Sequence, residues 1–266
     1  MLISVITINF NNREGLCRTI KSVAAQSFDD YEFIIIDGGS ADGSVEIIKD
    51  NAERINYWVS EKDRGIYHAM NKGIAQAQGN YCIFMNSGDS FYDNNVLYSF
   101  AKSKPSEDII VGKIFVNKPG VIISPHPKEE FTFYHLYSGS IPHQGSFIKT
   151  SLLRKYPYDE SLKISSDWKF FVQTMILDNC SVRFVDEYVA RYDLNGLSSD
   201  NPQLMREEKE RVLNDLFPPR ILDDYKMMKA SECLTQTLTP MLRDNYGIDK
   251  ILFRIGKFLL KFKGCR

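Results

Sequence analysis

The chain of 266 residues lacks the features that mark several common classes of protein. No uninterrupted apolar run approaches the roughly 20 residues that a transmembrane helix needs. The five cysteines form no Cys-x-x-Cys pair, and the four histidines show no His-Glu-x-x-His spacing. This pattern argues against a disulfide framework or a zinc site and indicates a reducing compartment. A net charge of -1 gives no electrostatic reason to expect a nucleic-acid partner.

The N-terminus and the glycine-rich stretches also lack familiar signals. Met1 to Ser4 has neither a basic lead-in nor a cleavage site, so it does not resemble a signal peptide. No Gly-x-Gly-x-x-Gly occurs, and the glycines of 38–43 are followed by Ser44, where a P-loop requires lysine. The composition, 43% hydrophobic and 25% charged, is ordinary for a soluble globular protein. We therefore expect a cytoplasmic protein that does not use either of these phosphate-binding loops.

The first half of the chain alternates strand and helix patterns. Strand-length apolar runs are separated by segments with an apolar helical face. Asn11 and Glu14 have capping-box spacing, which predicts Asn11 as the N-cap of the first helix. The alternation predicts an α/β fold with parallel strands joined by right-handed crossovers. The expected strands cover 2–8, 31–36, 55–59 and 81–85, and the expected helices cover about 16–24, 45–52 and 66–77.

Polar residues follow each of these predicted strands. The ends of parallel strands face the same way, so the loops should converge on one crevice, where open α/β sheets bind ligands. A crevice rich in carboxylates and amides suits a nucleotide whose phosphates are bridged by a metal. For the turn Asn86–Asp89 taken alone, an ordinary surface turn is the alternative. The converging residues are Asn9, Asn11, Asp37, Asp63, Arg64 and Asp89.

Four motifs in order make the prediction specific: 4–11 (SVITINFN), 36–44 (IDGGSADGS), 63–73 (DRGIYHAMNKG) and 85–89 (MNSGD). Together they resemble the motifs of family 2 glycosyltransferases, which have the GT-A fold. The resemblance implies a Rossmann-like, mostly parallel nucleotide-binding sheet in 1–95 and an acceptor-binding half in 96–200. We expect a helical extension in 201–266. The resemblance also implies inverting transfer of a sugar from a nucleotide sugar, usually a UDP-sugar, with Mg or Mn as the divalent metal.

The resemblance assigns roles by position. Ile8 and Asn9 would line the base, and Asp37 would contact the uracil or the ribose. Arg64 and Asn71 would lie near the diphosphate and the sugar. Asp89 would be the last carboxylate of an Asp-x-Asp-type metal motif, although Asn86 and Gly88 stand where many members carry carboxylates. Because Asp89 is the one carboxylate left in this motif, the alternative is a non-catalytic nucleotide-sugar-binding protein or assembly partner. The other expected donor-side residues are Asn11, Asp63, Asn86 and Gly88.

The second half is expected to bind the acceptor. Residues 108–116 and 121–124 have the pattern of two paired strands. His143 and Gln144 resemble the family's His-Gln segment and are expected in a strand on the acceptor side. His143 is either a ligand or acceptor contact there or a hydrogen-bonded histidine of the strand.

Asp167 stands just before an apolar helical face. A helix cap or a first-turn acid is the alternative, but the resemblance favours a general base that takes the proton of the acceptor hydroxyl. Trp168 beside it would stack on a sugar or pack in the core, and packing is the preferred interpretation. Residues 195–198 resemble a loop that closes over the donor diphosphate.

The C-terminal segment 248–266 combines apolar residues with six basic residues and one acidic residue, a net charge of +5. It has the pattern of a basic amphipathic helix that lies on an anionic membrane surface. A helix docked on the domain or on a second subunit is the alternative. A membrane-bound tail would suit a lipid-linked glycan acceptor in bacterial surface-polysaccharide synthesis and would hold the protein at the inner face of the plasma membrane.

Overall fold

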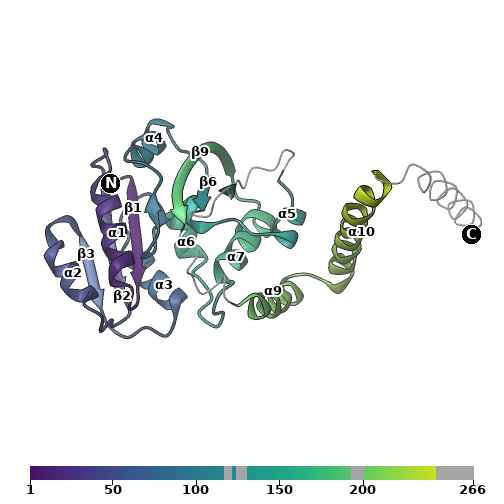
Figure 1. Ribbon diagram of the computed structural model, residues 1–266, viewed down its shortest axis with the longest axis horizontal. Helices are drawn as coiled ribbons and strands as arrows, with labels where there is room; N and C mark the ends of the chain where they lie inside the picture. Colours follow the sequence, from purple (N-terminus) through teal and green to yellow (C-terminus); the bar gives the residue numbers. More distant parts are fainter. Residues whose placement is uncertain (117–121, 124–130, 193–200, 244–266) are drawn as a thin grey trace, which may run out of the picture. The chain divides into compact units, whose positions relative to one another are not determined.

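The computed structural model describes residues 1–116, 122–123, 131–192 and 201–243. Over these residues it has an α/β architecture, with helices packed on a mixed sheet (Figure 1). The chain divides into two compact units, Met1–Val212 and Leu213–Arg266. The sequence analysis set its boundary earlier, after residue 200.

The first four strands confirm the predicted parallel arrangement. β1 (Ile3–Asn9) pairs in parallel with β2 (Tyr31–Asp37) on one side and with β4 (Tyr81–Phe84) on the other. β3 (Tyr57–Ser60) continues the parallel order beyond β2. These strands form where the sequence gives short β-branched and apolar runs, which suit a strand buried on both faces.

Helices cover both faces of this parallel part. Ile3 and Val5 of β1 share a buried cluster with Leu16 of α1 (Arg13–Ala24) and Ile48 of α2 (Ser44–Asp50). Alternate strand residues point to opposite faces. The next residue of β1, Ile6, accordingly meets α3 (Ile66–Gln76), where a Cβ added to Gly73 would lie only 2.5 Å from Ile6 Cγ2. A glycine at this position therefore lets α3 approach the sheet closely.

The second half extends the same sheet with antiparallel pairings. β8 (Ser146–Lys149) pairs with β4 and with β6 (Ile109–Val116), and β6 also pairs with β7 (Ile122–Ile123). The two predicted strands of this region are thus confirmed as a pair. β9 (Val182–Tyr192) runs parallel to β6 and antiparallel to β5 (Ser90–Phe91). The strand order is β3-β2-β1-β4-β8-β6-β9-β5, with β7 on β6.

Short helices surround the second half of the sheet, and two longer ones follow it. The short ones span three to seven residues each, whereas α10 (Pro219–Arg243) continues for 25 residues. The remaining elements are η1 (Ala52–Arg54), α4 (Val96–Lys102), α5 (Phe133–Ser138), η2 (His143–Gly145), α6 (Thr150–Lys155), α7 (Ser166–Phe171), η3 (Val172–Leu177), α9 (Pro202–Leu216) and α10 (Pro219–Arg243).

Two local predictions are wrong. The first helix is capped by Asn12, whose Oδ1 accepts a hydrogen bond from Gly15 N at 3.1 Å, because Asn11 instead takes a left-handed conformation with φ 47°. His143 and Gln144 lie in the turn η2 and not in a strand. The strand β8 begins only after Gly145, which sits so close to β6 that an added Cβ would lie 2.8 Å from Gly112 O.

Candidate active site

The carboxyl ends of the parallel strands meet at one edge, as predicted. Asn9, Asp37 and Ser60 end β1, β2 and β3, and the strand register places Asn9 beside Asp37 and Asp37 beside Ser60. Past the end of β4, Ser87 N donates to Ile8 O at 3.1 Å. This pairing carries the turn Asn86–Asp89 to the same edge.

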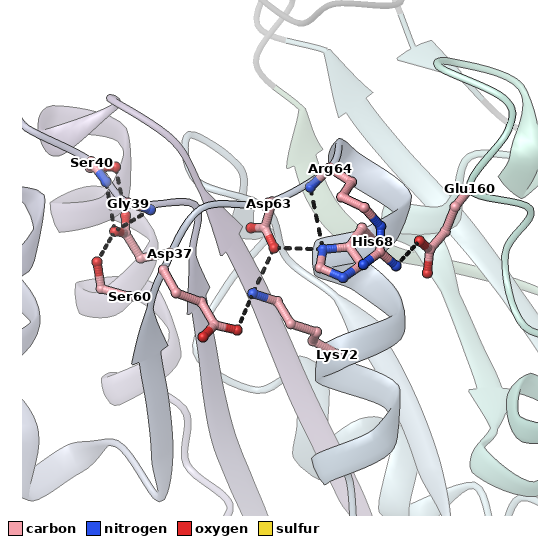
Figure 2. A network of polar contacts seen from close by, with 10 residues as sticks. Asp37, Gly39, Ser40, Ser60, Asp63, Arg64, His68, Lys72 and Glu160 are labelled. Carbon is pink, nitrogen blue, oxygen red and sulfur yellow. Dashed lines mark hydrogen bonds and ion pairs between the residues drawn. The ribbon is translucent and has the colours of Figure 1, made fainter.

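Asp37 is completely buried and binds its own loop. Its carboxylate accepts hydrogen bonds from Asn9 Nδ2, from the Ser40 and Ser60 hydroxyls, and from the main-chain N–H groups of Gly39 and Ser40. Figure 2 shows four of these donors around the carboxylate. Burial raises the pKa of Asp37, but the hydrogen bonds outweigh it and lower that pKa. The carboxylate therefore stays ionised, and a nucleoside could contact it only by displacing one of these donors.

The loop after β1 presents an aromatic side chain that the sequence analysis did not select. Phe10 is 66% exposed, and a Cβ added to Gly38 would lie 3.1 Å from its ring. In the part of the chain that the structure describes, the buried Asn9 Oδ1 has no hydrogen-bond partner. Asn11 contacts the neighbouring loop, since its Oδ1 accepts from Ala41 N at 2.9 Å. An aromatic residue between two strand-end asparagines was the available signal for Phe10.

Asp63 binds α3 through one oxygen (Figure 2). Its Oδ1 lies 2.6 Å from Lys72 Nζ and 3.0 Å from His68 Nδ1, and the side chain is 11% exposed. Lys72 Nζ also lies 3.0 Å from Glu61 Oε1. Burial lowers the pKa of Lys72, but the hydrogen bonds to Asp63 and Glu61 outweigh it and raise that pKa. Lys72 is therefore a fixed cation beside the predicted donor loops.

Arg64 and Asn71 both contact the loop that holds Glu160, and these contacts connect the first half of the chain to the second. Arg64 Nη2 donates to Glu160 Oε2 at 2.6 Å, and its side chain is 72% exposed (Figure 2). Both ends of the Asn71 amide bind the main chain of Tyr158, at 2.8 and 2.9 Å. Glu160 was not among the predicted site residues, although it is the second acid of the pair Asp159-Glu160.

The turn Asn86–Asp89 is held from α1. Gly88 adopts φ 110°, a conformation that favours glycine, and Asp89 N donates to Asn86 O at 2.9 Å. Thr19 Oγ1 donates to Asp89 O at 2.7 Å and accepts from Gly88 N at 3.1 Å. Asp89 is 4% exposed. The turn therefore has a fixed shape at the carboxyl end of β4.

A divalent cation at this turn would find one carboxylate of the protein, that of Asp89. Within the described ranges, no group of three or more His, Cys, Asp and Glu side chains is arranged to hold a metal ion. Mg²⁺ is commonly bound through one or two carboxylates together with substrate phosphates. Asp89 is a single carboxylate of that kind, so it fits a cation that the donor's phosphates also ligate.

Asp167 lies between two elements of different halves of the chain. Tyr67 of α3 donates its hydroxyl to Oδ1 at 2.9 Å, and His143 Nδ1 lies 2.9 Å from Oδ2. Burial raises the pKa of Asp167, but the hydrogen bonds from His143 and Tyr67 outweigh it and lower that pKa overall. Asp167 is thus an ionised carboxylate at neutral pH. It is not the N-cap of α7, because that position belongs to Ser165.

His143 also contacts the turn that carries Asp89. Its Nε2 lies 3.2 Å from Asn86 Nδ2. His143 therefore links Asn86, 57 positions before it, to Asp167, 24 positions after it, in one series of polar contacts. The structure thus brings together a predicted donor-side residue, a predicted acceptor-side residue and the predicted base.

Trp168 packs in the core, as the preferred interpretation had it. It is 1% exposed, its Nε1 donates to Leu136 O at 2.9 Å, and Lys209 Nζ lies 4.8 Å from its ring centroid. Stacking of Trp168 on an acceptor sugar is therefore wrong. Gln144 is buried as well.

Two predicted segments, 195–198 and 248–266, lie outside the described residues. In the portion of the chain that is described, no helix has the length and apolar character to cross a membrane.

Comparison with known proteins identifies the relatives of this arrangement. The model of the family described as Glycosyl transferase family 2 matches residues 4–162. Uncharacterized glycosyltransferase Rv1514c of Mycobacterium tuberculosis is 34% identical over 80% of this chain and 81% of its own length. PGL/p-HBAD biosynthesis glycosyltransferase Rv2957 of the same organism is 26% identical over 74% of this chain and 79% of its own.

Solved structures support the fold. The crystal structure of S. aureus TarS 1-349 in complex with UDP-GlcNAc matches with a TM-score of 0.68 and 20% sequence identity. The match covers 85% of this chain and 70% of that one. Against the longer TarS chain, the match spans 42% of its length. At this level of identity the likeness establishes the architecture.

Proposed function

The chain belongs to glycosyltransferase family 2, and from this premise we propose that it is an inverting enzyme with a nucleotide-sugar donor, a UDP-sugar by preference. Its acceptor would be a hydroxyl of a glycan or lipid-linked glycan in bacterial cell-envelope polysaccharide synthesis, in a capsule, exopolysaccharide or O-antigen. Support comes from relatives whose names or structures refer to PGL/p-HBAD biosynthesis and to UDP-GlcNAc.

The observation that carries this proposal is the carboxylate of Asp167, which His143 links to Asn86 of the turn that holds Asp89. The acceptor oxygen attacks the anomeric carbon, its proton passes to Asp167, and the bond between that carbon and the donor phosphate oxygen breaks. The nucleoside diphosphate leaves with the electron pair of that bond. A general base of this type needs a fixed position and an available lone pair. Tyr67, His143 and the main-chain N–H of Trp168 fix its position, and these three donors leave about one of the roughly four acceptor sites of the carboxylate available.

The donor would lie along the edge formed by the strand ends. Ile8, Asn9, Asn11 and Asp37 would surround the nucleoside, and the exposed ring of Phe10 offers it a flat apolar surface. The group Asp63, Arg64, Asn71, Asn86 and Gly88 would lie along the diphosphate and sugar. A divalent cation, Mg or Mn, held by Asp89 and the phosphates would supply positive charge for the leaving group.

The single carboxylate of the metal turn favours one alternative, a nucleotide-sugar-binding protein without transferase activity. The two functions make different predictions for donor turnover. We would incubate the full chain with a panel of UDP-sugars and glycan acceptors, with and without Mn, and measure UDP release. Acceptor-dependent release that Asp167→Asn suppresses supports the enzyme. Donor binding without turnover for every acceptor supports the alternative.

The acceptor proposal includes a membrane surface. Residues 248–266 have the sequence of a basic amphipathic helix, which binds anionic lipid through apolar burial and charge. The protein would then be peripheral at the inner face of the plasma membrane. Deletion of 247–266 should abolish sedimentation with phosphatidylglycerol vesicles while leaving donor binding unchanged. Equal sedimentation of the full and shortened chains would remove the proposed membrane contact.

A further inference from the structure

The hydrogen bonds of His143 show how its ring is protonated. An ionised carboxylate can only accept, so the 2.9 Å contact to Asp167 Oδ2 requires a proton on His143 Nδ1. The other nitrogen, Nε2, faces Asn86 Nδ2 at 3.2 Å and accepts from that amide. With the Asn86 amide in this orientation, the two contacts fit a neutral imidazole that donates to Asp167 and accepts from Asn86.

This arrangement leaves His143 no free lone pair for an acceptor hydroxyl. Both ring nitrogens are engaged, and the side chain is only 13% exposed. Asp167 is 17% exposed at its side chain, and its three donors, Tyr67, His143 and Trp168 N, leave acceptor capacity on the carboxylate. The proton of the acceptor therefore goes to Asp167, and the contribution of His143 acts through that carboxylate.

Few other titratable groups face Asp167 from the surrounding elements. Tyr67 donates to it from α3, and Tyr158 packs on Tyr67 with ring centroids 5.5 Å apart. Burial and the negative charge of Asp167 raise the pKa of both tyrosines, so both are neutral at physiological pH. Among these neighbours, Tyr67 and His143 are the side chains that contact the carboxylate directly.

The contact with Asn86 connects this pair to the donor side. Asn86 begins the turn that ends at Asp89, and its main-chain oxygen accepts from Asp89 N. In the described part of the chain, the buried Asn86 Oδ1 has no hydrogen-bond partner. The orientation of this amide is therefore set chiefly by His143 on one side and by the turn on the other.

We propose that His143 is a positioning residue that holds the Asp167 carboxylate ionised and aligned and couples it, through Asn86, to the donor-binding turn. The proposal rests on the proposed transferase function. The arrangement is analogous to a catalytic triad with the roles of the two groups exchanged, since here the imidazole orients the carboxylate.

Two amide substitutions separate the two contacts of the imidazole. The Asn amide nitrogen lies as many bonds from Cβ as His Nδ1, and the Gln amide nitrogen as many as His Nε2. His143→Asn therefore keeps a hydrogen-bond donor for Asp167. His143→Gln instead places its amide toward Asn86 and loses the donor for Asp167. We expect kcat to fall roughly tenfold to a hundredfold in His143→Gln, the range typical of removing an orienting partner, and less in His143→Asn. The KM for the donor should stay within about twofold in His143→Gln, which keeps an amide toward Asn86, and should rise in His143→Asn, which loses that contact.

The pH dependence of kcat gives a readout that a purely structural role would not move. The hydrogen bond from His143 lowers the Asp167 pKa, and activity needs the deprotonated carboxylate. Loss of that bond raises the pKa, so the acid limb of the profile should move to higher pH in His143→Gln and less in His143→Asn. Equal kcat values and equal acid limbs for the two variants would overturn the proposal. A loss in His143→Asn as large as in Asp167→Asn would also overturn it, by making His143 the base.

A measurement without turnover separates this inference from the transferase function. Nitrogen-15 NMR of the full chain should show His143 as the Nδ1–H tautomer at neutral pH, assigned by the missing signals of His143→Gln. An Nε2–H tautomer would refute the pairing even if transfer is normal. Conversely, the expected tautomer in a protein that never turns over a donor would refute the proposed function alone.

Discussion

Replacement of Asp167 by asparagine tests the site with the smallest change in shape. Tyr67 can still donate to the amide oxygen, as it donates to Oδ1 of the carboxylate. The new NH₂ group, however, faces the Nδ1–H of His143, so two donors oppose each other. The ring can relieve this by moving its proton to Nε2 if the Asn86 amide rotates, because Asn86 Oδ1 has no other partner among the described residues. Repacking is thus available without unfolding.

The expected effects on catalysis and on stability differ in size. Loss of general-base catalysis typically costs 10²- to 10⁴-fold, or about 2.7–5.5 kcal/mol of activation free energy. A hydrogen bond to a charged group contributes about 1.5–3 kcal/mol to stability, and relief from burying that charge offsets part of the loss. We therefore expect kcat to fall at least a hundredfold and the free energy of unfolding to fall by less than about 2 kcal/mol.

The assay compares transfer, donor affinity and urea unfolding in the wild type and in Asp167→Asn. Asp159→Asn serves as the matched control, since Asp159 is an acid of the same segment that pairs with Lys169 at 2.7 Å, whereas Asp167 contacts Tyr67 and His143. We expect the control to transfer at nearly the wild-type rate. Near-normal transfer by Asp167→Asn would refute the base and leave Asp167 as a first-turn acid of α7. Loss of donor binding in that variant would show that the substitution disturbs the other half of the site.

Three further predictions follow from other parts of the structure. Asp89→Asn should abolish the increase in UDP-sugar affinity caused by Mn, measured by calorimetry, with unchanged circular dichroism; an increase that survives would exclude Asp89 as the metal ligand. Burial raises the pKa of Asp159, but hydrogen bonds from Lys169 and Ser161 lower it to about 2. The stability from this depressed pKa is present above the usual Asp pKa and is lost as pH falls toward 2, so the stability gap between wild type and Asp159→Asn should shrink between about pH 4 and pH 2 in urea titrations. Gly73→Ala should destabilise the protein by about 1–2 kcal/mol, because overpacking against Ile6 exceeds the gain in helix propensity of up to about 1 kcal/mol; a more stable variant would show that α3 can move away from β1.

The sequence by itself determined the architecture of the first half. Strands and helices there are set by local patterns, namely short apolar runs, helical apolar faces and the turns between them. A parallel sheet then necessarily places Asn9, Asp37 and the turn of Asp89 at one edge. The motifs therefore suffice to predict that these residues converge there. The same local signals did not distinguish Asn11 from Asn12 as the helix cap, because either residue has a side chain suited to it and backbone φ made the choice.

The tertiary structure alone decided which polar groups act on one another. Asp37 looked like a free ligand, but five donors from three loops enclose it. Tyr67 and Asp167 are 100 residues apart, and their hydrogen bond depends on α3 and α7 packing on the same side of the sheet. Spacing in a sequence reports only neighbours along one element, whereas the protonation of His143 and Asp167 depends on distances and burial that arise when separate elements pack together.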